Sequence, residues 1–224
     1  MVRATRMLLT QPIIIMVAVY MAYLFGLTYL MLSTFAQLYT SPEYYDQSVQ
    51  DGSLHYAALA IGYVFGTQVT SYLDGWIYDR LQARYNGSEA PELRLPGMVP
   101  ATLLVPAGMF MYGWCAEGRT HWIWPDIGAF IVSAAIMSAY YCIQRYTVDA
   151  YTKYAASALA ATVTLRSIAG FCFPLFAPAM YDALRYGWGN SVLAFAAIVR
   201  GVPAPFIFWF YGAKMRAKSP FAAG

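Results

Sequence analysis

The feature that most constrains the fold of this chain is an apolar run near its start. Residues 12–39 contain no Asp, Glu, Lys or Arg. A helix needs about 20 mostly apolar residues to cross a bilayer, whereas the apolar core of a secretory signal has only ~7–15. The run also lacks a small-residue cleavage site at its end. The sequence therefore predicts a membrane-spanning helix, preceded by the basic residues Arg3 and Arg6.

Composition extends this conclusion to the whole chain. Of the 224 residues, 60% are hydrophobic and only 11% are charged, whereas soluble domains have ~25% charged residues. Because so few charges cannot cover a water-exposed surface, membrane lipid is the expected surrounding. The formal net charge of +3 is small, and the basic residues are dispersed along the chain. A nucleic-acid partner, which requires basic residues clustered on one face, is not expected.

The predicted fold class is an all-α membrane protein, with one bundle of six transmembrane helices formed by residues 1–224. Each apolar run is long enough to cross the bilayer or nearly so. The spans are expected at residues 12–39, 55–73, 97–115, 126–144, 155–181 and 188–211, with a cytoplasmic loop at residues 74–96.

The basic residues also predict an orientation. If the chain starts in the cytoplasm, ten of its 14 Lys and Arg residues lie in cytoplasmic segments and two in outer loops. The remaining two, Arg166 and Arg200, lie within spans. This excess follows the positive-inside rule, so both termini are expected in the cytoplasm. The run Asn86-Gly87-Ser88 fits the N-glycosylation pattern, and its predicted cytoplasmic position implies that it stays unmodified.

Small residues and prolines mark several spans. Gly62 and Gly66 have the small-xxx-small spacing that lets two membrane helices approach closely, and we interpret them as packing residues. Three spans contain proline pairs, which bend helices and suit a protein that encloses a cavity or changes shape. The pairs are Pro100 and Pro106, Pro174 and Pro178, and Pro203 and Pro205.

Cysteine and histidine give no sign of a metal site. Cys115, Cys142 and Cys172 lie far apart, without a CxxC or Cys/His ligand spacing. The two histidines, His55 and His121, lie beside predicted helix ends, and we interpret them as interfacial residues. No metal and no cofactor is therefore expected.

The stretch DGWIYDRLQAR at residues 74–84 gathers four ionised groups between two apolar runs. Within it, Gly75, Asp79, Arg80 and Arg84 resemble the short cytoplasmic loop signature of the major facilitator superfamily, Gly-x-x-x-Asp-Arg/Lys-x-Gly-x-Arg/Lys. Gln82 replaces the second glycine of this signature. These residues are expected to form a conformational latch, and the alternative is a generic basic loop.

The resemblance extends over nearly the whole chain. The runs at residues 20–30, 86–96, 148–158, 165–167 and 186–191 are similar to the second half of fungal drug:proton antiporters of the twelve-helix class. The resemblance implies efflux of a drug or secondary metabolite by proton antiport, in the plasma membrane. It also implies alternating access against a first six-helix half, which is either a separate chain or a second copy of this one.

Two other functions remain open at this point. The chain is either a half-length product or a piece of a longer one, and a half without a counterpart would be a non-transporting remnant or an assembly partner. A small integral membrane enzyme is the third alternative. Such chemistry usually requires an acid within the membrane, whereas the charges predicted within these spans are arginines, so the protein is not expected to be an enzyme.

Arg166 is the main candidate for the transport path. It lies about 11 residues into its predicted span, or ~16 Å deep, where an arginine costs at least ~2.5–3.5 kcal/mol. It is expected to contact an anionic or polar substrate or a proton-carrying acid. The alternatives are that it snorkels to the surface or pairs with Asp149. Arg200, beside Gly201 and Pro203, is a weaker candidate.

Two further groups complete the candidates. Aromatic and amide side chains are expected to line a cavity for an amphipathic substrate, although each one also fits ordinary packing. They are Tyr20, Tyr23, Tyr140, Tyr141, Gln144 and Phe173. Arg145, Asp149 and Lys153 have the four-residue spacing of one helical face, which predicts local ion pairing more readily than a proton relay.

Overall fold

Helices make up almost all of the computed structural model, which describes residues 2–85, 90–217 and 219. The predicted glycosylation motif Asn86–Ser88 lies outside the described residues. The α-helices are α1 (Val2–Thr10), α2 (Pro12–Thr40), α3 (Val49–Leu54), α4 (Tyr56–Arg84), α5 (Val99–Glu117), α6 (Ile123–Ala150), α7 (Ala155–Gly201) and α8 (Pro203–Ala217). Two 3₁₀ segments, η1 (Pro91–Met98) and η2 (Thr152–Tyr154), precede α5 and α7. The all-α class is confirmed.

Four helical stretches are long and apolar enough to cross a membrane within the described residues. They are Pro12–Thr40, Pro91–Glu117, Ile123–Ala150 and Thr152–Ala217. The last has 66 residues, or ~99 Å as a straight helix, against a hydrocarbon core of ~30 Å. The helix α4, with 29 residues, is long enough at ~43 Å but is not among the four.

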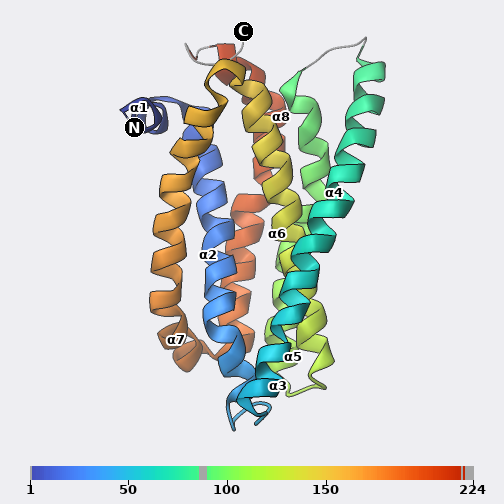
Figure 1. Cartoon of the computed structure of the whole chain (residues 1–224), viewed down its shortest axis with the longest axis vertical. Coiled ribbons are helices and arrows are strands. Elements are labelled where there is room, and N and C mark those ends of the chain that lie inside the picture. The colour runs from blue at the N-terminus through green and yellow to red at the C-terminus, as the bar shows by residue number, and fades with distance from the viewer. Residues whose placement is uncertain (1, 86–89, 218, 220–224) are drawn as a thin grey trace.

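The long stretch reverses direction at Arg185. This residue has φ 59° and ψ 179°, outside the helical range, inside α7. In Figure 1 the orange first part of α7 runs down the bundle, and the chain returns upward as the red helix that leads into α8. This φ value is in the left-handed region, which residues other than glycine rarely adopt. A turn therefore separates the two apolar runs that the sequence places at residues 155–181 and 188–211.

The bundle has two ends with different contents. Figure 1 shows α1 and the end of α8 together at one end, and α3 at the opposite end. We call these the α1 end and the α3 end. At the α3 end Ser48 caps α3, because its hydroxyl accepts a 3.1 Å hydrogen bond from the Asp51 amide. In the orientation predicted from the basic residues, the α1 end faces the cytoplasm.

Close contact between α4 and α6 depends on two glycines. A Cβ atom on Gly62 would lie 2.0 Å from the Ser133 hydroxyl, and one on Gly66 would lie 2.2 Å from the Ala134 carbonyl oxygen. The two helix backbones therefore touch at the Gly62–Gly66 pair, as its spacing predicts. Large apolar side chains such as Tyr72, Phe171 and Val199 point outward and are well exposed, which suits a lipid-facing surface.

One boundary differs from the prediction in a way that affects the site. The helix α4 continues to Arg84, so residues 74–84, predicted as the start of a loop, are helical. Residues 91–98 are 3₁₀-helical rather than loop. Hydropathy falls at residue 74, but a helix already formed continues at little cost beyond the apolar run.

Candidate functional site: an arginine among aromatic side chains

Arg166 lies where α2, α6 and α7 meet. Its guanidinium donates a close hydrogen bond to the Tyr140 hydroxyl on α6 and lies 4.5 Å from the centre of the Phe25 ring on α2. The Gln144 side chain donates a 2.6 Å hydrogen bond to the same hydroxyl. The structure therefore brings together three of the predicted residues, Arg166, Tyr140 and Gln144. It adds Phe25, for which the sequence offers no signal beyond an aromatic residue in a span.

The polar atoms of this group retain capacity for a ligand. The Tyr140 oxygen accepts two hydrogen bonds, so its two lone pairs are occupied and its own O–H is the group left to donate. Within the described residues that O–H has no recorded acceptor, and Arg166 has no carboxylate partner. A half-buried guanidinium beside a free hydroxyl donor fits a ligand with a negative or acceptor group. Among the described residues, Arg166 pairs neither with Asp149, the alternative that the sequence left open, nor with another acidic side chain.

Phe173, Tyr23 and Tyr20 occupy different surroundings. The Phe173 ring covers Gly26 of α2, where a Cβ would lie 2.7 Å from it, and meets the Tyr23 ring edge-on at 6.3 Å. Tyr23 is buried and donates a 2.5 Å hydrogen bond to the Leu193 carbonyl in the second part of α7. Tyr20 is also buried. Tyr23 therefore joins two helices, and Phe173 is the member of this set that packs on the α2 surface.

Tyr141 and Arg200 have weaker polar surroundings. The Tyr141 hydroxyl donates a 3.2 Å hydrogen bond to Ser71 on α4. The exposed Arg200 lies 5.5 Å above the Tyr23 ring. It also lines a groove of about 300 Å³ that contains Tyr20 and is otherwise almost entirely apolar.

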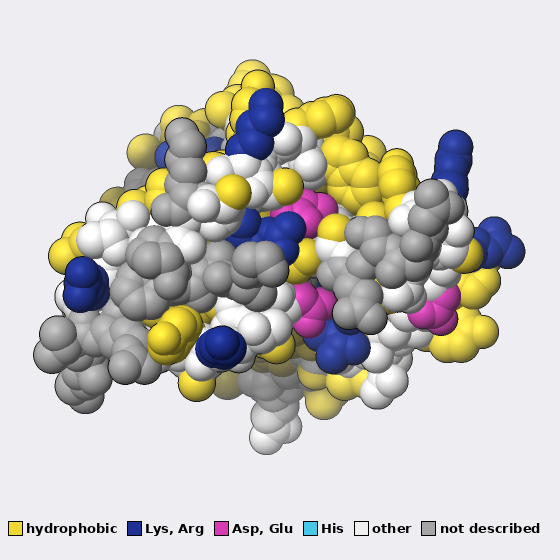
Figure 2. Space-filling model, turned by 90° about the horizontal axis from the view of Figure 1, so that it is seen from above, with side chains coloured by type: hydrophobic (Ala, Val, Ile, Leu, Met, Phe, Trp, Pro, Cys, Tyr) yellow, Lys and Arg dark blue, Asp and Glu magenta, His cyan; other side chains and the backbone are white. Residues whose placement is uncertain are grey.

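A buried ion-pair network lies toward the α1 end, where the sequence analysis did not place one. Arg94 donates to both Asp74, at 2.8 Å, and Asp149, at close range. The Asp74 side chain is only 2% exposed. Nearby, Arg216 of α8 pairs with Glu92 at 3.0 Å. Figure 2, which looks onto this end, shows acidic side chains beside basic ones near its middle and other basic side chains around it.

This network replaces the ion pairing predicted among Arg145, Asp149 and Lys153. Asp149 pairs with Arg94, whereas Arg145 is exposed and lies 5.6 Å from the Tyr141 ring centre. Lys153 is exposed in the middle of η2, the 3₁₀ segment that precedes α7. The local i, i+4 pairing predicted for Asp149 is replaced by a partner 55 residues away in the chain.

The predicted latch residues lie on the outer surface of α4. A Cβ on Gly75 would meet nothing within 4 Å, and Asp79 and Arg84 are exposed. Arg80 stacks over the Trp76 ring at 3.8 Å. Within the described part of the chain, the recorded ion pair of this stretch belongs to Asp74 instead. The sequence does contain a hint of this role, because Asp74 is the first residue of the same charged stretch.

This chain is similar over almost its whole length to fungal transport proteins. It is 47% identical over 222 residues to the efflux pump vrtL of Penicillium aethiopicum, which covers 99% of this chain and 44% of that protein. It is 43% identical over 210 residues to the MFS-type transporter oryF of Aspergillus oryzae, covering 94% of this chain and 43% of that protein. The chain belongs to the major facilitator superfamily (MFS).

This MFS chain spans about half the length of the curated relatives it matches. The probable efflux pump mfs2 of Aspergillus flavus, for example, is 38% identical over 216 residues, and the matched region is 51% of its length. These relatives are named as transporters or pumps, not as enzymes. No family model matches the chain, and no solved structure matches it.

The MFS assignment and the apolar helices together show a membrane protein. Among the described residues, no three His, Cys, Asp or Glu side chains lie together as a metal site. The candidate binding site is formed by Arg166, Tyr140, Gln144 and Phe25.

Proposed function

We propose that this chain forms one half of an exporter in which Arg166 binds an acceptor group of a small organic molecule. The observation that carries the proposal is the Arg166 guanidinium itself. It is held between the Tyr140 hydroxyl and the Phe25 ring without a carboxylate partner among the described residues. An intramembrane charge of this kind costs ~2.5–3.5 kcal/mol or more, and a substrate anion or acceptor offsets that cost during transport.

The proposed bundle has six passes. They are α2, α4, α5, α6 and the two parts of the stretch Thr152–Ala217, separated at Arg185. In this arrangement both termini face the cytoplasm, in line with the excess of basic residues there. The resemblance favours the C-terminal half of a twelve-helix transporter.

The second half would cover the side of the bundle on which Arg166 lies. Figure 1 shows α7, α2, α6 and α4 side by side across the front, and the Arg166 contacts come from three of them. A midplane site between two six-helix halves is the usual arrangement in such transporters. The partner is a separate N-terminal half or a second copy of this chain, and export is driven by proton antiport across the plasma membrane.

The test uses vesicles and a complete twelve-span protein. The chain is fused in place of the matching region of the vrtL pump, and uptake of a fluorescent organic acid is driven by an imposed pH gradient. The fusion is expected to transport, and the chain alone as a monomer is expected not to. Transport by the monomeric chain alone would show that no second half is needed. Inactivity of a folded fusion toward a panel of organic acids and cations would favour the assembly-partner alternative.

A matched pair of substitutions tests the site within the active fusion. Arg166→Gln removes the charge and is expected to lower the initial rate at least tenfold, because a charge-assisted hydrogen bond contributes ~1.5–3 kcal/mol. Arg119→Gln, an exposed arginine outside the predicted spans, serves as the control. An Arg166→Gln fusion that keeps the unmodified rate and substrate preference would remove Arg166 from the path.

A further inference from the structure

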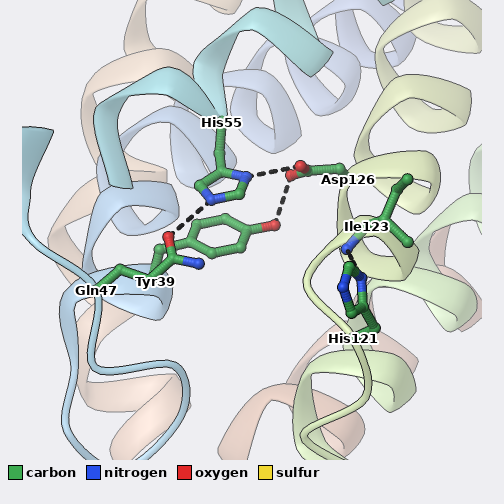
Figure 3. A network of polar contacts seen from close by, with 6 residues as sticks. All are labelled: Tyr39, Gln47, His55, His121, Ile123 and Asp126. Carbon is green, nitrogen blue, oxygen red and sulfur yellow. Dashed lines mark hydrogen bonds and ion pairs between the residues drawn. The ribbon is translucent and has the colours of Figure 1, made fainter. Parts of the chain in front are cut away.

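A cluster at the α3 end has no part in the site around Arg166. Figure 3 shows His55 between the side chains of Gln47 and Asp126, with the Tyr39 ring lying against it. His55 Nδ1 is 2.6 Å from one Asp126 carboxylate oxygen, and Nε2 is 2.8 Å from the Gln47 side-chain oxygen. The Tyr39 hydroxyl donates a 2.6 Å hydrogen bond to the other carboxylate oxygen of Asp126. Each of the two histidine nitrogens therefore has an acceptor as its partner.

The cluster is shielded from solvent. The His55 and Asp126 side chains are 9% and 13% exposed. The His55 ring stacks on Tyr39 with centres 3.7 Å apart and planes 8° from parallel, and meets Trp122 edge-on at 5.4 Å. Aromatic faces stabilise a cation, and a carboxylate offsets the loss of its hydration. The ring therefore lies between aromatic rings and a carboxylate, largely shielded from water.

The two hydrogen bonds of His55 are both formed when each ring nitrogen carries a proton. A carboxylate only accepts, and an amide oxygen only accepts, so both His55 nitrogens must donate in this arrangement. Neutral His55 has one N–H and would present a lone pair to one of these oxygens. Loss of the proton leaves one N–H on the ring. The Gln47 side-chain amide can then turn over and donate to Nε2, but the contact with Asp126 changes from an ion pair to a weaker hydrogen bond from a neutral donor. Proton binding and the orientation of Gln47 are thus linked.

The cluster connects the segments that meet at this end. His55 is the residue between α3 and α4, Tyr39 is in the last turn of α2, and Asp126 is in the first turn of α6. Gln47 is tied to α2 because its backbone N–H donates a 2.9 Å hydrogen bond to the Tyr39 carbonyl. One ionisable ring therefore joins α4 to α6 beyond the Gly62–Gly66 contact of the same two helices.

We propose that His55, paired with Asp126, is a proton-binding site of this protein at the α3 end, and that its protonation clamps α4 to α6. The inference deepens the proposed proton antiport and rests on it for its role in transport. In the predicted orientation the α3 end faces outside, where an exporter driven by protons takes them up. His55 accepts the proton from water and releases it to water, and Asp126 stays ionised throughout.

Other ionisable side chains also face the cluster and belong in any account of its pH dependence. Tyr45 stacks on Tyr39 with ring centres 5.4 Å apart. Tyr112 of α5 interacts electrostatically with both Tyr39 and Asp126. All of these groups are phenols, which are neutral between pH 5 and 8. Over that range the proposed change of charge in the cluster therefore falls on His55.

The test exploits the fact that the chain has only two histidines. The full chain, with ¹⁵N-labelled histidine and in lipid nanodiscs, is titrated by NMR, and His121→Gln assigns the two rings. His121 is exposed and accepts only a long 3.4 Å contact from the Ile123 amide, so it is the internal reference. Asp126→Asn is expected to lower the midpoint of the His55 titration by about one pH unit or more. Gln47→Glu is expected to raise it, because it adds a second carboxylate.

The opposite directions of these two shifts separate a proton-binding site from a merely structural contact. Midpoints that stay with the unmodified protein in both variants would overturn the site. The clamp has its own readout, hydrogen exchange at the start of α4, which is expected to become faster above the His55 midpoint. His55→Gln is expected to abolish that pH dependence, and pH-independent exchange in the unmodified chain would overturn the clamp. If the fusion transports without a proton gradient, antiport fails, while these titration shifts stand on their own.

Discussion

The contact between α4 and α6 yields the sharpest prediction for stability. Gly66→Ala adds one methyl group at a point where the ideal Cβ would lie 2.2 Å from the Ala134 carbonyl oxygen and 2.7 Å from its Cα. Heavy atoms in contact normally lie about 3.5 Å apart. The helices must therefore separate by about 1.3 Å, since both neighbours are backbone atoms that cannot rotate away.

The cost follows from that displacement. Overpacking by a methyl group typically costs ~1–3 kcal/mol. Separation also lengthens the 2.7 Å hydrogen bond from Thr70 to Ser138, and interhelical bonds in membranes average ~0.6 kcal/mol. We therefore expect Gly66→Ala to lower the free energy of unfolding by about 2–3 kcal/mol, which is a loss of more than tenfold in the folding equilibrium.

The matched control is on the same helix. Gly75→Ala places its methyl group in open space, and replacing glycine by alanine within a helix gains up to ~1 kcal/mol. Steric trapping in bicelles, which measures unfolding free energies in lipid, compares the two variants directly. A Gly66→Ala protein as stable as the Gly75→Ala protein would refute the close backbone contact.

Three further outcomes are expected. Arg94→Gln leaves the buried Asp74 unpaired and should cost ~3–5 kcal/mol in the same unfolding assay, and adding Asp74→Asn should restore most of the loss. Arg80→Gln removes an exposed charge with no recorded ion pair among the described residues, so its effect should stay below ~1 kcal/mol. Single cysteines in a chain lacking the native ones should react with an impermeant maleimide only from the cytoplasm at Arg84→Cys and only from outside at Arg119→Cys, and the reverse pattern would contradict the predicted orientation.

The helices and one of their contacts follow from local sequence. The apolar runs mark α2, α5 and α6 because lipid requires every backbone polar group to be bonded within its own segment, which a helix achieves. The spacing of Gly62 and Gly66 predicts a close helix contact, and the structure places a partner backbone there. Boundaries are less well predicted, and α4 runs 11 residues past the predicted end of its span, from 73 to Arg84.

The polar contacts are much harder to predict. Asp149 has basic residues four positions away on either side, yet it pairs with Arg94, which is 55 residues distant. Asp74 opens the charged stretch that contains the predicted latch, yet its partner Arg94 lies 20 residues away. His55 shows only a position beside a helix end, and its partner Asp126 is 71 residues away.

Sequence alone determined that this protein is helical, that it is embedded in lipid and that it resembles major facilitator superfamily transporters. Those properties depend on composition and on patterns within single segments. The tertiary structure decided which side chains meet. It joined Arg166 to Tyr140 and Phe25, Asp74 to Arg94, and His55 to Asp126. Each of these contacts links different helices, and its geometry depends on how the helices are rotated and spaced, which no segment specifies by itself.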